Sequence, residues 1–266
     1  MLAAAASVGA VLVALSGRAT LAGLLLAIAV VAKQTAVLAI LPAVLALPRP
    51  ARRTLAIPVA AAALVYVPLW FLSHDSPQAG GLSSSSFFHP CQIWWPFGVP
   101  SSAAWAAGGH GSLTSPAWLR PIPHPLIVGL AVPLSALWWW RGGEQRPRED
   151  ALALFALLAL ERCLLDPWNL GYYHLPLVLA LLAWECQRRR LPVMTLAVTI
   201  TTWLTFRTFE LRHGMTPMLT YLAWTLPLVA ALARALYARP APATLTRRCV
   251  GPSSAARPSS PSTSTT

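Results

Sequence analysis

The chain has 266 residues, of which 56% are hydrophobic and only 11% are charged, and it carries a formal net charge of +12. A soluble domain carries about 25% charged residues, whereas here the few charges separate long apolar stretches, so the sequence predicts no soluble globular fold. The basic residues lie in short loops and in the tail, which is typical of membrane topology and argues against nucleic-acid binding.

The amino-terminal part contains three apolar segments. Leu2–Leu15 is short for a full crossing, and Thr20–Leu47 is long and contains Lys33 and Pro42. The sequence leaves open whether Thr20–Leu47 is one kinked helix or two half-helices. Thr54–Leu72 is a further apolar span, and the polar and aromatic stretch Ser73–Pro123 follows it.

Five more apolar segments complete the chain. They are His124–Trp140, Ala151–Leu165, Gly171–Trp184, Leu191–Phe206 and Thr216–Tyr237. Lipid offers no hydrogen-bond partners to the backbone, so such segments must be helical. The predicted fold class is therefore all-α, a polytopic membrane helix bundle with seven or eight transmembrane helices.

Arginine clusters predict the orientation of the bundle. Three loops and the tail hold most of the arginines, and these regions fall on one side if the spans alternate: Arg49, Arg52 and Arg53; Arg141, Arg146 and Arg148; Arg188, Arg189 and Arg190; and Arg234 onward. The positive-inside rule places this side in the cytoplasm. We therefore expect a multi-pass protein of the cell membrane with an outer loop at 73–123 and a cytoplasmic carboxyl end.

The last part of the chain differs in composition. Residues 1–238 form the predicted transmembrane domain, whereas residues 239–266 are rich in Pro, Ser, Thr and Ala. Such a tail cannot bury apolar surface and is predicted to be disordered in the cytoplasm. Four cysteines show no metal-ligand spacing, and a Cys91–Cys163 disulfide is left open.

Lys33 is the only lysine of the chain and lies beside Gln34 within an apolar run. A cation at such a position needs an anionic partner or a water-filled cavity. One interpretation is a ligand for phosphate or pyrophosphate. The other is an ammonium group that an internal carboxylate, Asp166 or Glu161, neutralises.

A second group of polar residues lies between Glu161 and Pro176, in the sequence ERCLLDPWNLGYYHLP. Arg162 and Asp166 are four residues apart, a spacing at which side chains on a helix can pair. Pro167 disfavours a helical conformation at Asp166, so the helix should end there and restart near Tyr172. The alternatives are a binding site or a plain hairpin turn; the further candidates here are Asn169, Tyr172, Tyr173 and His174.

Two more candidates lie in the expected outer regions. The segment FFHPCQIWWPFG contains Trp94 and Trp95, which either stack on a sugar ring or anchor the loop in the head-group layer. Arg207 is either a second phosphate contact or the partner of Glu210 at the surface.

Three stretches, Gly23–Leu47, His89–Gly98 and Leu164–Glu185, resemble the GT-C class of polytopic glycosyltransferases, and in particular the actinobacterial branch similar to glycosyltransferase family 87. The resemblance implies transfer of a hexose such as mannose from a polyprenyl-phosphate carrier at the outer membrane face. GT-C enzymes are similar in carrying a catalytic acidic residue in their first outer loop, and no residue here matches that motif, since Asp75 has a different setting. The resemblance thus implies a truncated chain whose catalytic residue is unassigned.

We therefore expect a membrane glycosyltransferase whose partners are a lipid-linked sugar donor and membrane lipids. No cofactor is expected, although a divalent metal is left open. Two other functions remain as alternatives. One is a transporter or flippase for an anionic or lipid-linked substrate, and the other is a non-catalytic subunit that binds a membrane protein partner.

Overall fold

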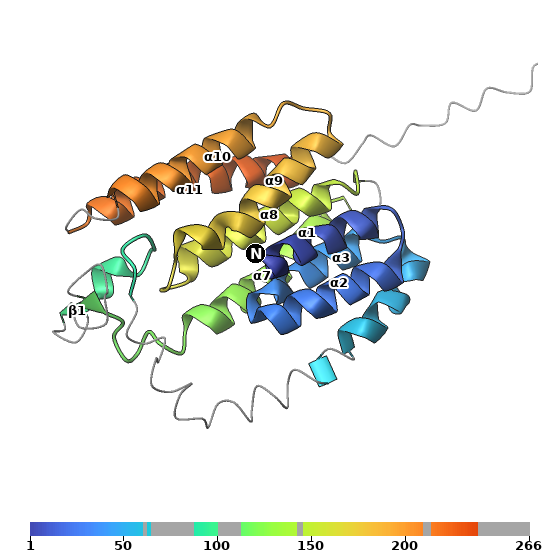
Figure 1. Cartoon of the computed structure of the whole chain (residues 1–266), viewed down its shortest axis with the longest axis horizontal. Coiled ribbons are helices and arrows are strands. Elements are labelled where there is room, and N and C mark those ends of the chain that lie inside the picture. Colours follow the sequence, from blue (N-terminus) through green and yellow to red (C-terminus); the bar gives the residue numbers. More distant parts are fainter. Residues whose placement is uncertain (61–62, 65–87, 101–112, 143–145, 210–213, 239–266) are drawn as a thin grey trace, which may run out of the picture.

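The structure, a computed structural model, describes residues 1–60, 63–64, 88–100, 113–142, 146–209 and 214–238. Within these ranges the chain is mainly helical (Figure 1). The longer helices are α1 (Leu2–Leu15), α2 (Ala19–Ala32), α3 (Ile40–Ala46), α7 (Pro123–Trp140), α8 (Asp150–Leu165), α9 (Leu175–Gln187), α10 (Val193–Leu204) and α11 (Thr216–Tyr237). Strands β1 (Val99–Pro100) and β2 (Leu113–Thr114) form one short antiparallel pair.

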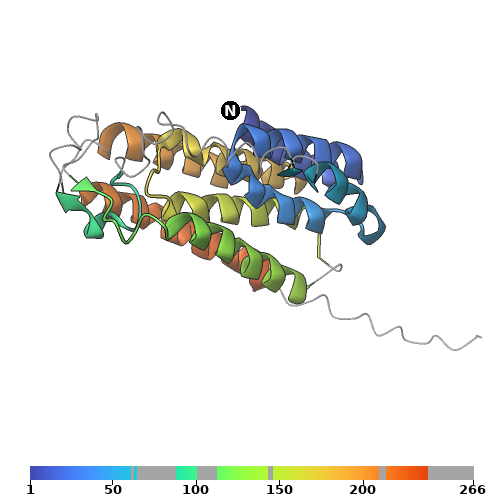
Figure 2. The same ribbon diagram turned by 90° about the horizontal axis from the view of Figure 1, so that it is seen from below.

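Short helices of other types join these elements. They are the 3₁₀ helices η1 (Gln34–Ala39), η2 (Arg49–Ala51), η4 (Trp95–Phe97) and η6 (Gly171–His174), and the π-helix η7 (Thr205–Phe209), which continues α10. The second view shows the main helices aligned along one direction, so that the connections gather at the ends of the bundle (Figure 2).

The amino-terminal helices form a hairpin. Helices α1 and α2 are both 14 residues long and pack against each other along their length, with Ser16–Arg18 as the turn. Met1 and Lys33 line the same pocket, so the turn lies about 21 Å away at the other end of the helices. Gly23 of α2 permits close packing against the segment that follows η2, because a Cβ on this residue would lie 2.2 Å from Pro58 Cγ.

The chain reverses at Lys33. Helix α2 ends there with extended backbone, and η1 and α3 then return toward the end of the bundle that contains the α1–α2 turn. Of the two alternatives that the sequence left open for Thr20–Leu47, the structure therefore has two separate, antiparallel pieces. Because of this reversal, Arg18 lies at the same end as Arg49. We call this the arginine end of the bundle and the opposite one the Lys33 end.

Helix α8 is the central helix. All of its residues are buried, and it packs against α9, α11, α7, α3 and α1. Its sequence is apolar on every side except at its ends, and a helix of this kind belongs in the interior of a bundle. At its first residue, Asp150 accepts hydrogen bonds from Trp184 on α9 and from Arg188 just beyond it.

The sequence located most helix boundaries well. Leu2–Leu15 and Thr216–Tyr237 agree with α1 and α11, and the predicted break after Leu165 with a restart near Tyr172 is confirmed. Cys91 and Cys163 are free thiols, so the disulfide left open is not formed. Most of the predicted outer loop at 73–123, Asp75, Glu210 and the tail at 239–266 lie outside the described residues.

By length and composition, α11 is the helix within the described ranges that could cross a membrane, with 22 residues. Leu2–Leu15, Ala19–Ala32 and Gln34–Ala46 are apolar but shorter.

Glu185 connects α9 to α10. Its carboxylate accepts hydrogen bonds from the backbone N–H of Met194 at 2.9 Å and of Thr195 at 3.0 Å, and from the Thr195 hydroxyl at 2.6 Å. These N–H groups belong to the first turn of α10, where the helix itself leaves them without acceptors. The side chain therefore fixes the angle between the two helices.

We expect Glu185→Ala to destabilise the chain by about 2 kcal/mol, because buried donors of α10 lose a charged acceptor. Thermal unfolding of the purified chain measures the effect. Gln187→Ala, an exposed position at the end of the same helix, is the matched control and should change stability by less than about 0.5 kcal/mol. Equal losses in both variants would contradict this role.

Candidate functional site

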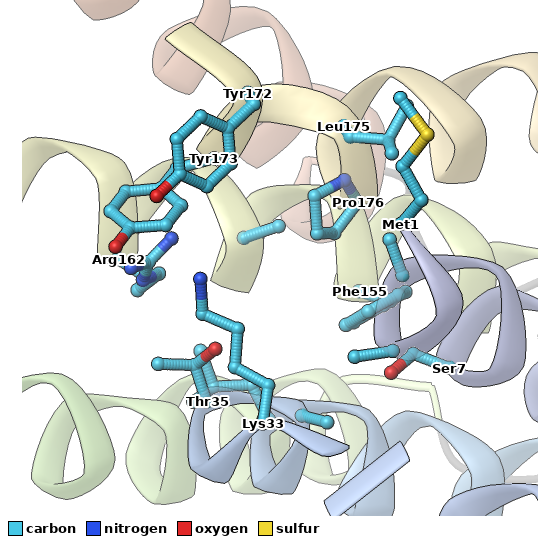
Figure 3. A pocket seen from close by; sticks show the side chains of 15 residues that line it. Met1, Ser7, Lys33, Thr35, Phe155, Arg162, Tyr172, Tyr173, Leu175 and Pro176 are labelled. Atoms are coloured by element: carbon cyan, nitrogen blue, oxygen red, sulfur yellow. The ribbon is translucent and has the colours of Figure 1, made fainter. Parts of the chain in front are cut away.

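The site is built around two breaks in the helices at the Lys33 end. At the first break, Lys33 has φ −161° and ψ 121° and ends α2. No proline or glycine lies at this position, so tertiary contacts decide where the helix stops. Because the main chain is extended there, the Lys33 side chain leaves the helix axis and points toward Tyr173 and Arg162 (Figure 3).

The second break follows α8. Asp166 has the extended conformation that a following proline favours, with ψ 118°. Its carboxylate accepts a hydrogen bond from Arg162 Nη2 at 2.6 Å and another from the backbone N–H of Trp168 at 3.0 Å. Both charged side chains are at least nine-tenths buried. The predicted Arg162–Asp166 pair is therefore present and holds the turn that follows the helix.

Tyr173 brings the two cations together. Lys33 Nζ lies 3.7 Å from the centre of its ring, and Arg162 Cζ lies 4.0 Å from it. Lys33 Nζ also lies 5.5 Å from the centre of the Tyr172 ring. The faces of aromatic rings carry partial negative charge and attract cations, most strongly where water is excluded. The Tyr173 ring thus lowers the repulsion between an ammonium and a guanidinium group.

Neither carboxylate expected as a neutralising partner contacts Lys33. Within the part of the chain that the structure describes, no carboxylate oxygen lies within 4 Å of Lys33 Nζ. Asp166 is engaged by Arg162, and neither oxygen of Glu161 has a hydrogen-bond partner among the described residues. Lys33 is therefore positioned by aromatic rings, with its ammonium group facing a cavity.

This cavity has a volume of about 480 Å³, and Lys33, Arg120 and Arg162 supply positive charge to its lining. Ser115 and Arg120 contribute to it from the segment that leads into α7, and His124 contributes from the first turn of α7. The Ser115 hydroxyl is buried without a hydrogen-bond partner in the described structure. We call it the cationic cavity. The residues that line it are Lys33, Gln34, Thr35, Ser115, Arg120, His124, Arg162, Asp166, Pro167, Trp168 and Tyr173.

A smaller pocket of about 90 Å³ adjoins the cationic cavity and shares Lys33, Thr35, Arg162 and Tyr173 with it (Figure 3). Its other walls are mostly apolar and come mainly from α1, η1, α8, η6 and α9. They are Met1, Ala3, Ala4, Ser7, Ala36, Leu38, Phe155, Ala159, Tyr172, Leu175 and Pro176. Lys33 and Arg162 therefore lie where the cationic cavity meets this smaller pocket, which we call the apolar pocket.

Other predicted candidates lie in the protein interior beside this site. Asn169 Nδ2 donates to the Cys91 carbonyl at 2.7 Å, and His174 Nε2 is 2.9 Å from the Tyr221 hydroxyl. The His174 ring also packs near Phe206 of η7, with 5.2 Å between the ring centres. Neither Asn169 nor His174 lines the cationic cavity or the apolar pocket. Asn169 therefore joins the second break to the segment that contains Cys91, and His174 joins it to α11.

The two tryptophans proposed for sugar stacking also make internal contacts. Trp94 Nε1 donates to the Leu165 carbonyl at 2.7 Å, and Trp95 Nε1 donates to the Gly214 carbonyl at 2.9 Å. The Trp95 ring is buried and stacks on Phe88. Neither indole lines the two spaces, and Arg207 is exposed on η7 and does not line them either.

Sequence reasoning missed Arg120, His124 and Ser115 as site residues. The prolines that flank Arg120 in the sequence SPAWLRPIPHP indicate irregular backbone before α7, and this was the available signal. No group of three His, Cys, Asp or Glu side chains among the described residues is arranged to hold a metal ion.

Comparisons of the chain with protein-family models, with curated proteins and with solved structures returned no match. The GT-C resemblance therefore stays a prediction, and the site has to be interpreted from its own chemistry.

The Arg162–Asp166 pair gives a test of the site's construction. We expect Arg162→Met to cost about 3 kcal/mol in unfolding free energy, because it leaves the Asp166 carboxylate buried without its partner. The double variant Arg162→Met/Asp166→Asn should regain at least about 1 kcal/mol of the lost unfolding free energy, because the unpaired buried carboxylate is then removed as well. Chemical denaturation of the purified variants measures both values.

Arg207→Met, at an exposed arginine, is the matched control and should cost less than about 0.5 kcal/mol. A double variant that is no more stable than Arg162→Met would show that the two charges are not coupled.

Proposed function

We propose that the chain is a polytopic membrane protein that binds a lipid-linked sugar phosphate and transfers the sugar. The observation that carries this proposal is the cationic cavity with its adjoining apolar pocket. A phosphate group fits beside Lys33 and Arg162, while an isoprenoid or acyl chain fits against apolar walls. A ligand that needs both environments is an amphiphile with an anionic head.

The distribution of exposed side chains supports the membrane part of the proposal. Leu21, Leu24, Ile28 and Val31 form an exposed apolar stripe along α2. Helix α10 carries a similar stripe, which consists of Val193, Leu196, Ile200 and Trp203. Charged groups such as Arg162 and Asp166 are buried instead. Apolar side chains outside and ion pairs inside are the arrangement expected of a bundle surrounded by lipid.

Helix lengths are compatible with a bilayer whose hydrocarbon core is about 30 Å thick. Helix α11 has 22 residues and α7 has 18, which correspond to about 33 Å and 27 Å. Helices α1 and α2 are about 21 Å long, and a short helix is accommodated by local thinning of the bilayer. In this arrangement Lys33 lies near one membrane boundary, where a lipid head group is accessible.

The proposed reaction is glycosyl transfer, as the resemblance to the GT-C class implies. An acceptor hydroxyl attacks the anomeric carbon of the sugar and gives up its proton to a base that is unassigned in this chain. The bond from the anomeric carbon to the phosphate oxygen breaks, and the lipid phosphate leaves with the bonding electron pair. Lys33 and Arg162 would stabilise the negative charge that develops on the leaving phosphate. Cations that are already in position before the reaction lower the free energy of such a transition state. Asp166 orients Arg162, and Trp168 and His124 lie on the cavity wall where the sugar would bind.

Binding of polyprenyl-phosphate mannose to the purified chain tests the role of Lys33. We expect Lys33→Gln to weaken binding about tenfold, since a charge-assisted contact to phosphate is lost. Arg18→Gln removes one positive charge at the exposed α1–α2 turn and is the matched control, for which we expect unchanged affinity.

A sugar-transfer assay with the same donor and the same variants separates binding from chemistry. Transfer that falls in parallel with binding supports the transferase. Binding without transfer by the wild type would favour the transporter or flippase, or the partner subunit. Equal affinity of wild type and Lys33→Gln would remove Lys33 from the mechanism.

Cys186 reports the proposed orientation, in which the arginine end is cytoplasmic. It is an exposed free thiol at the end of α9, whereas Cys91 and Cys163 are buried. In a Cys249→Ser background, we expect a membrane-impermeant maleimide to label inverted membrane vesicles and not intact cells. A Cys186→Ser variant should abolish the labelling, and labelling of intact cells would overturn the orientation.

A further inference from the structure

One wall of the cationic cavity is not used by the contacts assigned so far to the lipid phosphate. Lys33 and Arg162 come from the two helix breaks, whereas Ser115 and Arg120 come from the segment between β2 and α7. This segment is distant in sequence from both breaks and contributes its own part of the lining. Its chemistry therefore has to be explained separately from that of the two breaks.

The segment between β2 and α7 is held in place by an apolar anchor. Leu119 is fully buried and packs in a cluster with Phe88 and Trp95. Its backbone N–H also donates a hydrogen bond to the Pro116 carbonyl at 3.0 Å, which closes a turn directly before Arg120. The backbone that carries Arg120 is therefore fixed, although the side chain itself is exposed.

Ser115 presents a hydroxyl donor that has no acceptor. The residue directly follows β2 and is only 4% exposed, and among the described residues its hydroxyl has no hydrogen-bond partner. Buried hydroxyl groups normally have such a partner, because water no longer supplies one. Since Ser115 lines the cationic cavity, an oxygen atom of a ligand bound there would accept this hydrogen bond.

The charges of the described lining do not balance around a single phosphodiester. Asp166 neutralises Arg162, so Lys33 and Arg120 keep their positive charges. Within the described ranges, neither of these two cations has a carboxylate oxygen within 4 Å. The phosphodiester that joins a lipid to a sugar carries one negative charge, which Lys33 matches. The charge of Arg120 is then left for a second anion.

We propose that Arg120 and Ser115 bind a second phosphate group in the cationic cavity, at a position that we call the second subsite. The proposal rests on the proposed function, because it takes Lys33 and Arg162 as the contacts of the lipid phosphate. A guanidinium group can bind two phosphate oxygens at once, and the Ser115 hydroxyl adds a neutral donor beside it. The second phosphate belongs either to the sugar donor, which is then a lipid diphosphate, or to the acceptor.

Binding to the full chain, purified in a neutral detergent, tests the second subsite. The probes are polyprenyl phosphate, polyprenyl diphosphate, and inorganic phosphate added to chain that is already saturated with polyprenyl phosphate. We expect Arg120→Gln to weaken binding of the second phosphate at least about tenfold, and Ser115→Ala to weaken it several-fold. Binding of polyprenyl phosphate alone should change by less than about twofold in both variants, because this ligand does not reach the second subsite.

The same titrations identify the molecule that carries the second phosphate. Polyprenyl diphosphate that binds the wild type at least about tenfold more tightly than polyprenyl phosphate, with the preference lost in Arg120→Gln, assigns it to the donor. Equal binding of the two lipids, together with binding of inorganic phosphate that depends on Arg120, assigns it to the acceptor.

Arg207→Gln and Ser135→Ala are the matched controls. Arg207 is exposed, Ser135 has a buried hydroxyl without a partner in the described structure, and neither residue lines the cationic cavity. Both control variants should bind the second phosphate as the wild type does. Equal losses in the controls, or no binding of a second phosphate to the wild type, would overturn the second subsite and leave the proposed function standing. Failure of the wild type to bind either lipid would contradict both.

Discussion

The complete burial of α8 is the constraint on which the rest of the structure depends. A helix with no exposed side chain needs neighbours on every side, and α1, α3, α7, α9 and α11 provide them. Unpaired buried charge is costly, and two of its three charged residues are paired within the protein. Glu161, the third, has no hydrogen-bond partner among the described residues. Asp150 at one end accepts hydrogen bonds from Trp184 and Arg188, and Arg162 at the other end pairs with Asp166.

This constraint also explains where polar cavities lie in the bundle. Apolar side chains fill the middle of the bundle, so polar space is available only where helices end or break. At the Lys33 end, the breaks after α2 and α8 bring Lys33 and Arg162 to one tyrosine ring. At the arginine end, a second cavity lies where α3 and α7 end, and four arginines and two tryptophans line it. Both cavities are thus consequences of helix termination around one fully buried helix.

The sequence predicted the helices and the Arg162–Asp166 pair because these depend on local patterns: apolar runs, a four-residue spacing and a proline. It left open whether Thr20–Leu47 is one helix or two, because no proline or glycine marks the reversal at Lys33. Asn169 and His174 were grouped with Tyr173 by proximity in sequence, but η6 turns His174 toward α11 while Tyr173 faces Lys33. Arg120 reaches the site from a distant segment, and only the folded chain shows that contact.

The position of Lys33 above Tyr173 has a consequence for the exchange of ligands. An ammonium group held by a carboxylate must give up that partner before it can bind another anion, and the displaced carboxylate then repels the newcomer. Tyr173 holds the ammonium through its ring face, which carries no net charge. An anion can therefore approach Lys33 without displacing a competitor, and it can leave without an internal anion to replace it. Asp166 does not enter this exchange, since it remains bound to Arg162 and to the backbone of Trp168.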